Sequence, residues 1–413
     1  MVLVAHPFGN ANVRAVLDAL QASGVLAKYI TALGWSERSP LLRLAPSAVR
    51  SSLTRRSYRL PREKLEVHPL REILRLAAGP LRADRLIEHE RGFASVDRLW
   101  SALDVAAARH LRANQRTENI TGVYAYEDCA LQLFDAAREL GVRRVYDLPI
   151  AYWETAQRLL KEEAERYPDW EPTLGGTRDS AAKLARKSQE LELAELVVCP
   201  SNFVLESLPE TTRATKRCVM VPFGSPTVAQ QDATQRPRSR KLRVLFAGAM
   251  TQRKGLADLF AATKLIGSTE VELVVMGSLV RPLSFYREQF PHFIHEPPRP
   301  HADVLRLMRS CDVFVLPSIV EGRALVQQEA MACGLPLIAT RNAGGDDLIT
   351  DGETGFLVPI RSPEALAERI SWCATHRETT YGMGIAAQAR AAELTWRGYG
   401  EKILAAIRAL TAE

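Results

Sequence analysis

The chain has 413 residues, of which 46% are hydrophobic and 25% charged, with a formal net charge of +6 at pH 7. These proportions are typical of a globular protein, and the length predicts two domains. Six scattered cysteines without a CxxC pair argue against a structural zinc site. Because the N-terminal residues lack a signal-peptide pattern and no apolar run is long enough to span a bilayer, we expect a cytoplasmic protein.

The first half of the chain predicts a parallel sheet with helices on both faces. Residues 2–7 (VLVAHP) are typical of an apolar strand, and residues 12–24 of a helix that Gly24 ends. Residues 120–154 and 192–201 continue the alternation of strands and helices. Gly9, between the first strand and helix, is expected to let the backbone approach a ligand. No GxGxxG motif surrounds it, so dinucleotide binding is not predicted.

Four polar residues follow predicted strand ends in this half. His6 ends the first strand, and Glu127, Asp128 and Asp147 lie at or just beyond the ends of later strands. Ligands of open α/β sheets bind at the carboxyl ends of strands, so these residues are candidates for acceptor binding or proton transfer. A structural role is the more frequent outcome for such a histidine, and the acids could equally cap helices.

A basic segment lies between these elements. Residues 38–75 contain ten Lys or Arg against three Glu, a net charge of +7. Two stretches, residues 41–53 and 71–78, mix leucine with arginine, which suits peripheral contact with an anionic membrane or a phosphorylated acceptor. A solvated pair of basic helices is an equal alternative. Nucleic acid is not expected, because no DNA-binding signature accompanies the charge.

The second half predicts another domain. Residues 1–221 form the first domain, a polar stretch at residues 222–240 is the expected linker, and residues 241–390 form the second domain. Its first strand ends at Gly248, and a helix is expected over residues 256–267. Arg253 and Lys254 lie in the loop between them, where two cations can neutralise a diphosphate leaving group. A surface pair of basic residues is the alternative.

The most specific pattern is residues 317–334 (PSIVEGRALVQQEAMACG). An apolar strand leads into a turn and a short helix, and Gly334 stops that helix. The backbone N–H groups at the expected helix start suit a diphosphate, and they belong to Arg323, Ala324 and Leu325.

Two glutamates, Glu321 and Glu329, flank this helix start. Along a helix they would lie about 12 Å apart, at about 1.5 Å per residue. The paired carboxylates of glycosidases are closer, roughly 5 to 9.5 Å apart. The two glutamates therefore look placed to hold opposite ends of one long ligand.

These residues resemble family 4 of the retaining glycosyltransferases (glycosyl transferases group 1). The matching motifs are E-x7-E from Glu321 to Glu329, AMACG-x-P at residues 330–336, and Gly344-Gly345. The resemblance implies the α/β fold called GT-B, in which two Rossmann-like domains face each other across a cleft. It also implies that Glu321 contacts the donor sugar and Glu329 the ribose, although each could be an ordinary helix-dipole or surface residue.

The resemblance implies further placements. A C-terminal helix within residues 391–413 would pack back on the first domain. Relatives commonly carry an arginine where this chain has Ala249, so either Arg253 replaces it or the site uses one cation fewer. They also carry a histidine in the segment that here contains Tyr146 and Asp147, whose role stays open. Three residues lie near the loop where relatives hold the base: His295, Arg299 and His301.

The predicted function is transfer of a sugar, with retention, from a nucleotide diphosphate sugar to an acceptor hydroxyl in polysaccharide or glycoconjugate biosynthesis. The acceptor would be a saccharide or a lipid-linked molecule. No metal or other cofactor is expected, because the cations and the helix start already supply positive charge. The predicted catalytic residues are Glu321, Arg253 and Lys254, and the predicted donor-binding residues are Glu329, Arg323, Ala324, Leu325, Gly248 and Gly9. Alternatives are a GT-B epimerase, a phosphorylase, or a non-catalytic nucleotide-sugar-binding protein.

Overall fold

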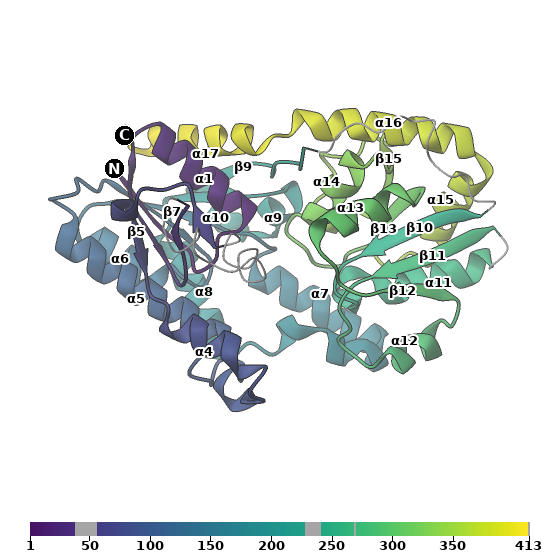
Figure 1. The fold of residues 1–413 in the computed structure, drawn as a ribbon, viewed down its shortest axis with the longest axis horizontal. Helices are drawn as coiled ribbons and strands as arrows, with labels where there is room; N and C mark the ends of the chain where they lie inside the picture. Colours follow the sequence, from purple (N-terminus) through teal and green to yellow (C-terminus); the bar gives the residue numbers. More distant parts are fainter. Residues whose placement is uncertain (38–55, 228–240, 268–269, 412–413) are drawn as a thin grey trace.

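The computed structural model describes residues 1–37, 56–227, 241–267 and 270–411. Two parallel sheets with helices on both faces form two Rossmann-like units, which confirms the predicted fold class (Figure 1). The leucine- and arginine-rich stretch predicted at residues 41–53 lies outside the described residues, as does most of the predicted linker, residues 228–240. Among the described helices, none combines the length and apolar character needed to cross a membrane.

The first sheet has seven parallel strands in the order β5-β2-β1-β6-β7-β8-β9. Its central strands are buried along their whole length, because helices cover both faces of a parallel sheet. The strands are β1 (Val2–Ala5), β2 (Leu26–Thr31), β5 (Leu65–Val67), β6 (Gly122–Tyr126), β7 (Arg143–Asp147), β8 (Leu196–Cys199) and β9 (Arg217–Met220). A separate pair joins β3 (Trp35–Ser36) to β4 (Ser57–Tyr58).

The helices of this half follow the predicted alternation, and several begin at a side-chain cap. Ser95 and Ser180, for example, accept hydrogen bonds from the backbone N–H groups of Arg98 and Lys183 at the starts of α5 and α8. The helices are α1 (Ala11–Ala22), α4 (Leu70–Ala78), α5 (Val96–Asn114), α6 (Leu131–Glu139), α7 (Trp153–Arg166), α8 (Ala181–Leu193), α9 (Asn202–Ser207) and α10 (Glu210–Thr215).

The second sheet has six parallel strands in the order β12-β11-β10-β13-β14-β15. The strands are β10 (Leu242–Ala247), β11 (Val271–Met276), β12 (Phe293–Glu296), β13 (Val313–Leu316), β14 (Leu337–Thr340) and β15 (Gly355–Val358). The helices are α11 (Leu256–Ile266), α12 (Leu283–Gln289), α13 (His301–Arg309), α14 (Leu325–Ala332), α15 (Pro363–Thr375) and α16 (Arg377–Glu393), and a 3-10 turn, η6 (Gln252–Lys254), precedes α11.

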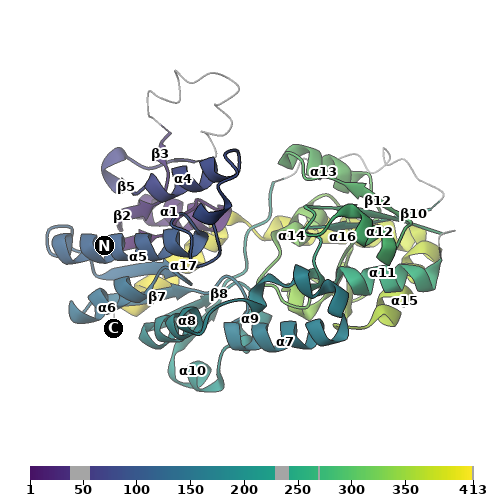
Figure 2. The ribbon, with the colours of Figure 1, turned by 90° about the horizontal axis from the view of Figure 1, so that it is seen from below.

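Two segments cross between the halves. The C-terminal helix α17 (Trp396–Thr411) packs on α1, where Gly400 comes so close to the Ala15 carbonyl that an added Cβ would lie 2.5 Å from its oxygen (Figure 1). In the other direction, α7 and the 3-10 turn η3 (Pro168–Thr173) pack on the second unit (Figure 2). Trp170 lies in the second unit's core, with its ring centroid 6.0 Å from that of Phe260.

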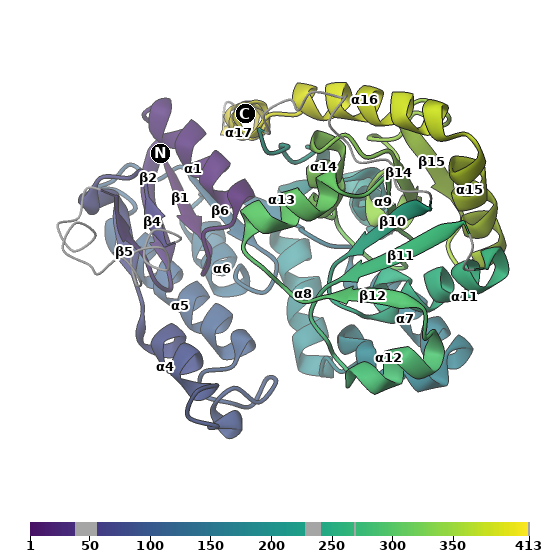
Figure 3. The ribbon, with the colours of Figure 1, turned by 45° about the vertical axis from the view of Figure 1, so that its right-hand side comes forward.

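The carboxyl ends of the two sheets face each other. The loop after β7 touches the E-x7-E turn, because an added Cβ on Gly322 would lie 1.7 Å from the carbonyl oxygen of Pro149. Ser201, just after β8, donates a hydrogen bond of 2.7 Å to the carbonyl oxygen of Gly322. Residues at both sets of strand ends therefore share one interdomain region, which Figure 3 shows between the two sheets.

Candidate active site

Three predicted catalytic residues form one charge cluster. Lys254 Nζ lies 2.6 Å from Glu321 Oε2, and an Arg253 guanidinium nitrogen lies 3.1 Å from the same oxygen. Lys254 and Glu321 are largely buried, with side chains 11% and 14% exposed, while Arg253 is 26% exposed. Two cations and one carboxylate leave this cluster a net positive charge of one.

Glycines and backbone hydrogen bonds hold the cluster in place. Gly248 ends β10 with φ 152°, and an added Cβ would lie 2.8 Å from Cδ of Lys254, so the missing side chain makes room for the lysine. At Gly255, φ is 72° and a Cβ would lie 2.0 Å from the Pro317 carbonyl oxygen. The Arg253 guanidinium donates to the carbonyl oxygen of Val320 at 2.8 Å. The loop after β10 is thus fixed against the loop after β13.

The two cations also keep Glu321 ionised. Burial alone would raise the pKa of this carboxyl, but the charges of Arg253 and Lys254 and their hydrogen bonds outweigh it and lower the pKa. A carboxylate held in this way is an anionic hydrogen-bond acceptor near neutral pH.

Helix α14 begins close to the predicted position. Leu325 is its first residue, with Ala324 as the flanking residue. The N–H of Ala324 lies 3.4 Å from the Ala343 carbonyl oxygen, so it is already directed at a protein acceptor. The predicted end is confirmed, because Gly334 follows the last turn with φ 76°.

The side chain of Arg323 has a structural role, separate from the diphosphate contact predicted for its backbone N–H. Its side chain is fully buried and pairs with Asp347 at 2.7 Å. It also donates to the Pro200 carbonyl oxygen at 3.2 Å and to Gln328 at 3.1 Å. Because Pro200 follows β8, this arginine ties the E-x7-E turn to the first unit. Its side chain contributes structure here, and its backbone N–H alone is left for the predicted role.

Glu329 lies on α14 and is 22% exposed at its side chain. The His301 ring, at the start of α13, places Nδ1 3.7 Å from a Glu329 carboxylate oxygen. Burial raises the pKa of Glu329, and His301 partly offsets the rise. His295 and Arg299 lie nearby in sequence but bond to other groups, Gly277 and Glu296.

The Gly344-Gly345 loop packs against the same motif. Gly344 has φ 74°, and an added Cβ would lie 2.4 Å from the Gly322 carbonyl oxygen. A Cβ on Gly345 would lie 2.6 Å from Gln327 Oε1. The two glycines therefore allow a close approach that any side chain would block.

Gly9, predicted to let the backbone approach a ligand, lies against Tyr58. An added Cβ there would lie 2.5 Å from the Tyr58 hydroxyl, so the missing side chain makes room for the tyrosine ring, and the ligand contact stays a prediction. Arg14 reinforces this packing by donating to the Gly9 carbonyl oxygen at 2.8 Å. The neighbouring His6 is 3% exposed and receives a hydrogen bond from the Phe8 N–H. Burial lowers the pKa of His6 to about 3, so it is neutral near pH 7.

The acids predicted at the strand ends of the first unit belong mainly to internal networks. Asp147 is 1% exposed and accepts a hydrogen bond of 2.5 Å from Tyr124, so it cannot reach an acceptor in this arrangement. Asp128 pairs with Arg186 at 2.6 Å. Glu127 pairs with Lys187 at 3.2 Å, while its other oxygen is buried without a hydrogen-bond partner among the described residues. Glu127 therefore keeps one carboxylate oxygen that no described protein group bonds, although that oxygen is buried.

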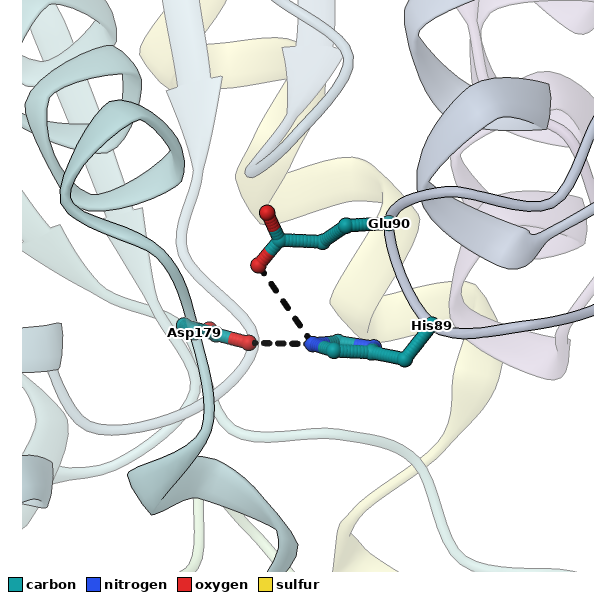
Figure 4. A group of neighbouring side chains, drawn as sticks. All are labelled: His89, Glu90 and Asp179. Carbon is teal, nitrogen blue, oxygen red and sulfur yellow. Dashed lines mark hydrogen bonds and ion pairs between the residues drawn. The ribbon is translucent and has the colours of Figure 1, made fainter.

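One other cluster has the geometry of possible metal ligands. His89 Nε2 lies 3.2 Å from Asp179 and 3.4 Å from Glu90 (Figure 4). Lys183 also lies 2.9 Å from Asp179, and Ser180 donates to Glu90, so protein groups already satisfy these carboxylates. The cluster ties the segment before α5 to the start of α8.

Two structural residues of the interdomain region had no clear signal in the sequence. Trp170, from the first half of the chain, lies in the second unit's core. Arg361 in turn reaches back from the second unit to pair with Glu162 at 2.7 Å. The one sequence signal for Trp170 was a tryptophan within a polar stretch. Arg361 had no such signal.

The family model described as "Glycosyl transferases group 1" matches residues 241–376. The D-inositol 3-phosphate glycosyltransferase of Paenarthrobacter aurescens (strain TC1) is 31% identical over 184 residues, covering 39% of this chain and 44% of that protein. The protein of the same name from Arthrobacter sp. (strain FB24) is 32% identical over 191 residues, covering 42% and 44%. The chain thus spans less than half of the length of these curated relatives.

Solved structures match over nearly the whole chain. Sucrose-phosphate synthase from Thermosynechococcus elongatus has a TM-score of 0.67 at 17% identity, covering 100% of this chain and 99% of that one. HepE of Anabaena in complex with UDP has a TM-score of 0.62 at 16% identity, covering 99% of each. The chain therefore has the GT-B fold, and its second domain matches the glycosyl transferases group 1 family model.

Proposed function

We propose that this protein is a glycosyltransferase that moves a sugar from a nucleotide diphosphate sugar to an acceptor hydroxyl. The observation that carries the proposal is the convergence of Lys254 and Arg253 on Glu321 at the carboxyl end of the second sheet. Ligands of parallel α/β sheets bind at this end. The family-model match over residues 241–376 supports the same reading.

In the proposed reaction the bond between the anomeric carbon and the diphosphate breaks, and a bond from that carbon to the acceptor oxygen forms. Lys254 and Arg253 stabilise the negative charge that develops on the leaving diphosphate. The N–H groups of Leu325 and Val326 at the start of α14 add positive potential, whereas the Gln327 N–H already donates to the Ala324 carbonyl oxygen. The departing phosphate takes the acceptor's proton, so the protein need not supply a general base.

Glu321 and Glu329 have separate proposed roles. Glu321 would orient the donor sugar, because the paired cations beside it place it at the diphosphate. Glu329, on α14 beyond the first turn, would bind the ribose hydroxyls. These roles, like membership of family 4 and retention of configuration, rest on the resemblance of the E-x7-E motif.

The donor nucleotide and the acceptor are also proposals. A uridine nucleotide is the first donor to test, because the similar HepE structures contain UDP and UDP-glucose. The first domain would bind a saccharide or lipid-linked acceptor, and the buried Glu127 oxygen that no described protein group bonds is a candidate contact. We also propose peripheral contact with an anionic membrane, as predicted for residues 38–75, and no requirement for a metal or other cofactor.

The test is to incubate the protein with nucleotide sugars and a panel of saccharide acceptors, with and without a chelator. The proposal predicts acceptor-dependent release of nucleotide diphosphate that the chelator leaves unchanged, and a product whose anomeric configuration by NMR equals that of the donor. Donor consumption without any acceptor would instead indicate an epimerase. Binding of a nucleotide sugar without turnover on any acceptor would favour a non-catalytic binding protein.

A further inference from the structure

Helix α4 has its polar and apolar sides reversed relative to an ordinary surface helix. Glu72 is 1% exposed, and it pairs with Arg56 at 3.0 Å and with Arg75 at 2.7 Å. The apolar residues point outward, with exposed fractions of 62% for Leu70, 51% for Ile73 and 43% for Leu76. Burying a carboxylate while leaving leucines in water is unfavourable for an isolated globular protein. The exposed face is therefore expected to contact something other than water.

The apolar surface continues beyond α4. Of the 14 large hydrophobic residues exposed in the described chain, eight lie within residues 67–96. Leu81 is the most exposed of them at 72%, and Phe93 is 48% exposed. Figures 1 and 3 show α4 and the segment after it projecting from one edge of the first domain. Apolar side chains gathered in this way mark an interaction surface.

A groove between the start of α4 and α5 adds positive charge to this surface. Its volume is about 580 Å³, and no carboxylate is among its described lining residues. Three arginines line it, Arg71, Arg98 and Arg109, together with apolar groups that include Phe93. Within the described parts of the chain, none of the three arginines forms an ion pair with an acidic side chain. The groove thus offers unneutralised guanidinium groups beside apolar side chains.

Arg71 illustrates this excess of charge. Its guanidinium carbon lies 4.0 Å from the centre of the Phe93 ring, and it donates to the Phe93 carbonyl oxygen. Burial and the neighbouring positive charge of Arg98 lower the pKa of Arg71. An anion bound between the two arginines would relieve that repulsion.

We propose that residues 67–109 dock on an anionic lipid surface, with the apolar side chains in the headgroup region and the groove arginines on lipid phosphates. This inference rests on the proposed membrane contact and places it at α4, the end of the basic segment, and at the groove beside that helix. Exposed leucines beside unpaired arginines suit a lipid interface, because guanidinium groups bind phosphate and apolar side chains enter the acyl boundary. A second copy of the chain would leave facing arginines without counterions.

Docking here would also bring the first domain's strand ends towards the lipid. Arg75, on α4, lies over the Phe8 ring at 5.7 Å, and Phe8 follows β1. The face proposed for the acceptor and the face proposed for the membrane are therefore neighbours, as a lipid-linked acceptor would require.

The test is co-sedimentation of the full chain with vesicles of phosphatidylcholine, with and without phosphatidylglycerol. We expect retention on anionic vesicles at low salt, weakened at high salt because the Debye length falls from about 10 Å at 0.1 M to about 3 Å at 1 M. The apolar variant removes three exposed side chains through Leu70→Ser, Ile73→Ser and Leu81→Ser. The arginine variant removes two groove arginines through Arg98→Ser and Arg109→Ser. Each should bind at least about tenfold more weakly.

Matched controls carry the same kinds and numbers of substitutions on other exposed surfaces: Leu140→Ser with Leu265→Ser and Ile385→Ser, and Arg116→Ser with Arg213→Ser. They should bind like the unaltered protein. Absence of retention, equal retention on neutral vesicles, or full retention of both patch variants would overturn the proposal. So would a concentration-dependent dimer that only the apolar variant abolishes. A nucleotide thermal shift on the same samples reports the donor site separately, so the failure of docking and the failure of glycosyl transfer are distinguishable.

Discussion

The two domains use their charged residues in opposite ways. In the second, Lys254 and Arg253 converge on Glu321 at a strand end and hold it ionised. In the first, Asp147 at the end of β7 and Glu190 on α8 are buried, bonded to protein groups and shifted upward in pKa, to about 7 and about 8, chiefly by burial. Acidic side chains are thus kept charged by neighbouring cations in one domain and taken up by internal contacts in the other.

The largest effect is expected for Lys254→Ala. Removing a group that stabilises developing charge commonly costs about 100- to 1,000-fold in turnover, so kcat should fall by that order. The matched control is Lys264→Ala, because Lys264 is an exposed lysine on α11, the helix that follows Lys254. This variant should leave kcat nearly unchanged. Steady-state kinetics with a nucleotide sugar measures both. A Lys254→Ala protein with unaltered kcat would remove the lysine from the proposed site.

Gly322→Ala should separate the E-x7-E turn from the first domain. The added methyl would lie 1.7 Å from the Pro149 carbonyl oxygen, so backbone must move. Overpacking of this kind costs about 1 to 3 kcal/mol in stability, measurable by urea unfolding, with a parallel loss of turnover. Gly175→Ala, which has no neighbour within 4 Å of the added Cβ, is the control. Equal stability of the two variants would contradict the close interdomain contact.

Glu329→Gln should weaken donor binding more than it slows chemistry. A hydrogen bond from a ribose hydroxyl to a charged acceptor contributes about 1.5 to 3 kcal/mol. Removing the charge of Glu329 should therefore raise the donor KM about tenfold or more and leave kcat little changed. Because burial raises the pKa of Glu329, donor binding should also weaken as the pH falls and its carboxylate is protonated. The control is the exposed Glu368→Gln. A fall in kcat without a change in KM would count against the ribose role.

The smallest effect on turnover is expected for Asp147→Asn, but the pH dependence of stability should change. The folded pKa is about 7, and an unfolded aspartate has a pKa of about 3.9. The folded state therefore holds an extra proton between these values, and its stabilising contribution, complete below about pH 4, is lost as the pH rises towards 7.

Urea unfolding across this range should show that slope in the unaltered protein and a smaller slope in Asp147→Asn. Each unit of pKa difference corresponds to about 1.4 kcal/mol. The exposed Asp84→Asn should keep the slope. An unchanged slope in Asp147→Asn would show that this carboxyl does not titrate abnormally.

Much of the second domain was predictable because its signals are local. The strand before Gly248, the helix over residues 256–267 and the stop at Gly334 all depend on short apolar periods and on glycines next to them. Within the charge cluster, Glu321 was predicted from the fixed spacing of the E-x7-E motif. Its details were less predictable: the Ala324 N–H is directed at the Ala343 carbonyl oxygen, and the Arg323 side chain turns towards Asp347 and Pro200.

The first domain was harder to predict because its decisive contacts are distant in sequence. Gly9, for example, packs against Tyr58, which lies far along the chain. Asp147 looked accessible at a strand end, but α17 covers it with Tyr399. No local pattern reveals which later side chain will cover an earlier one. The inverted burial of α4 likewise depends on Arg56 pairing with Glu72.

The most direct test of the account is a thermal-shift panel of uridine, guanosine and adenosine diphosphates and their sugars, with and without a chelator. A ligand that binds only the folded state raises the apparent melting temperature. We predict that one nucleotide series raises it in the unaltered protein and in Lys264→Ala, independently of chelator, and not in Lys254→Ala. No shift with any nucleotide, or an equal shift in Lys254→Ala, would contradict a donor site built on Lys254, Arg253 and Glu321.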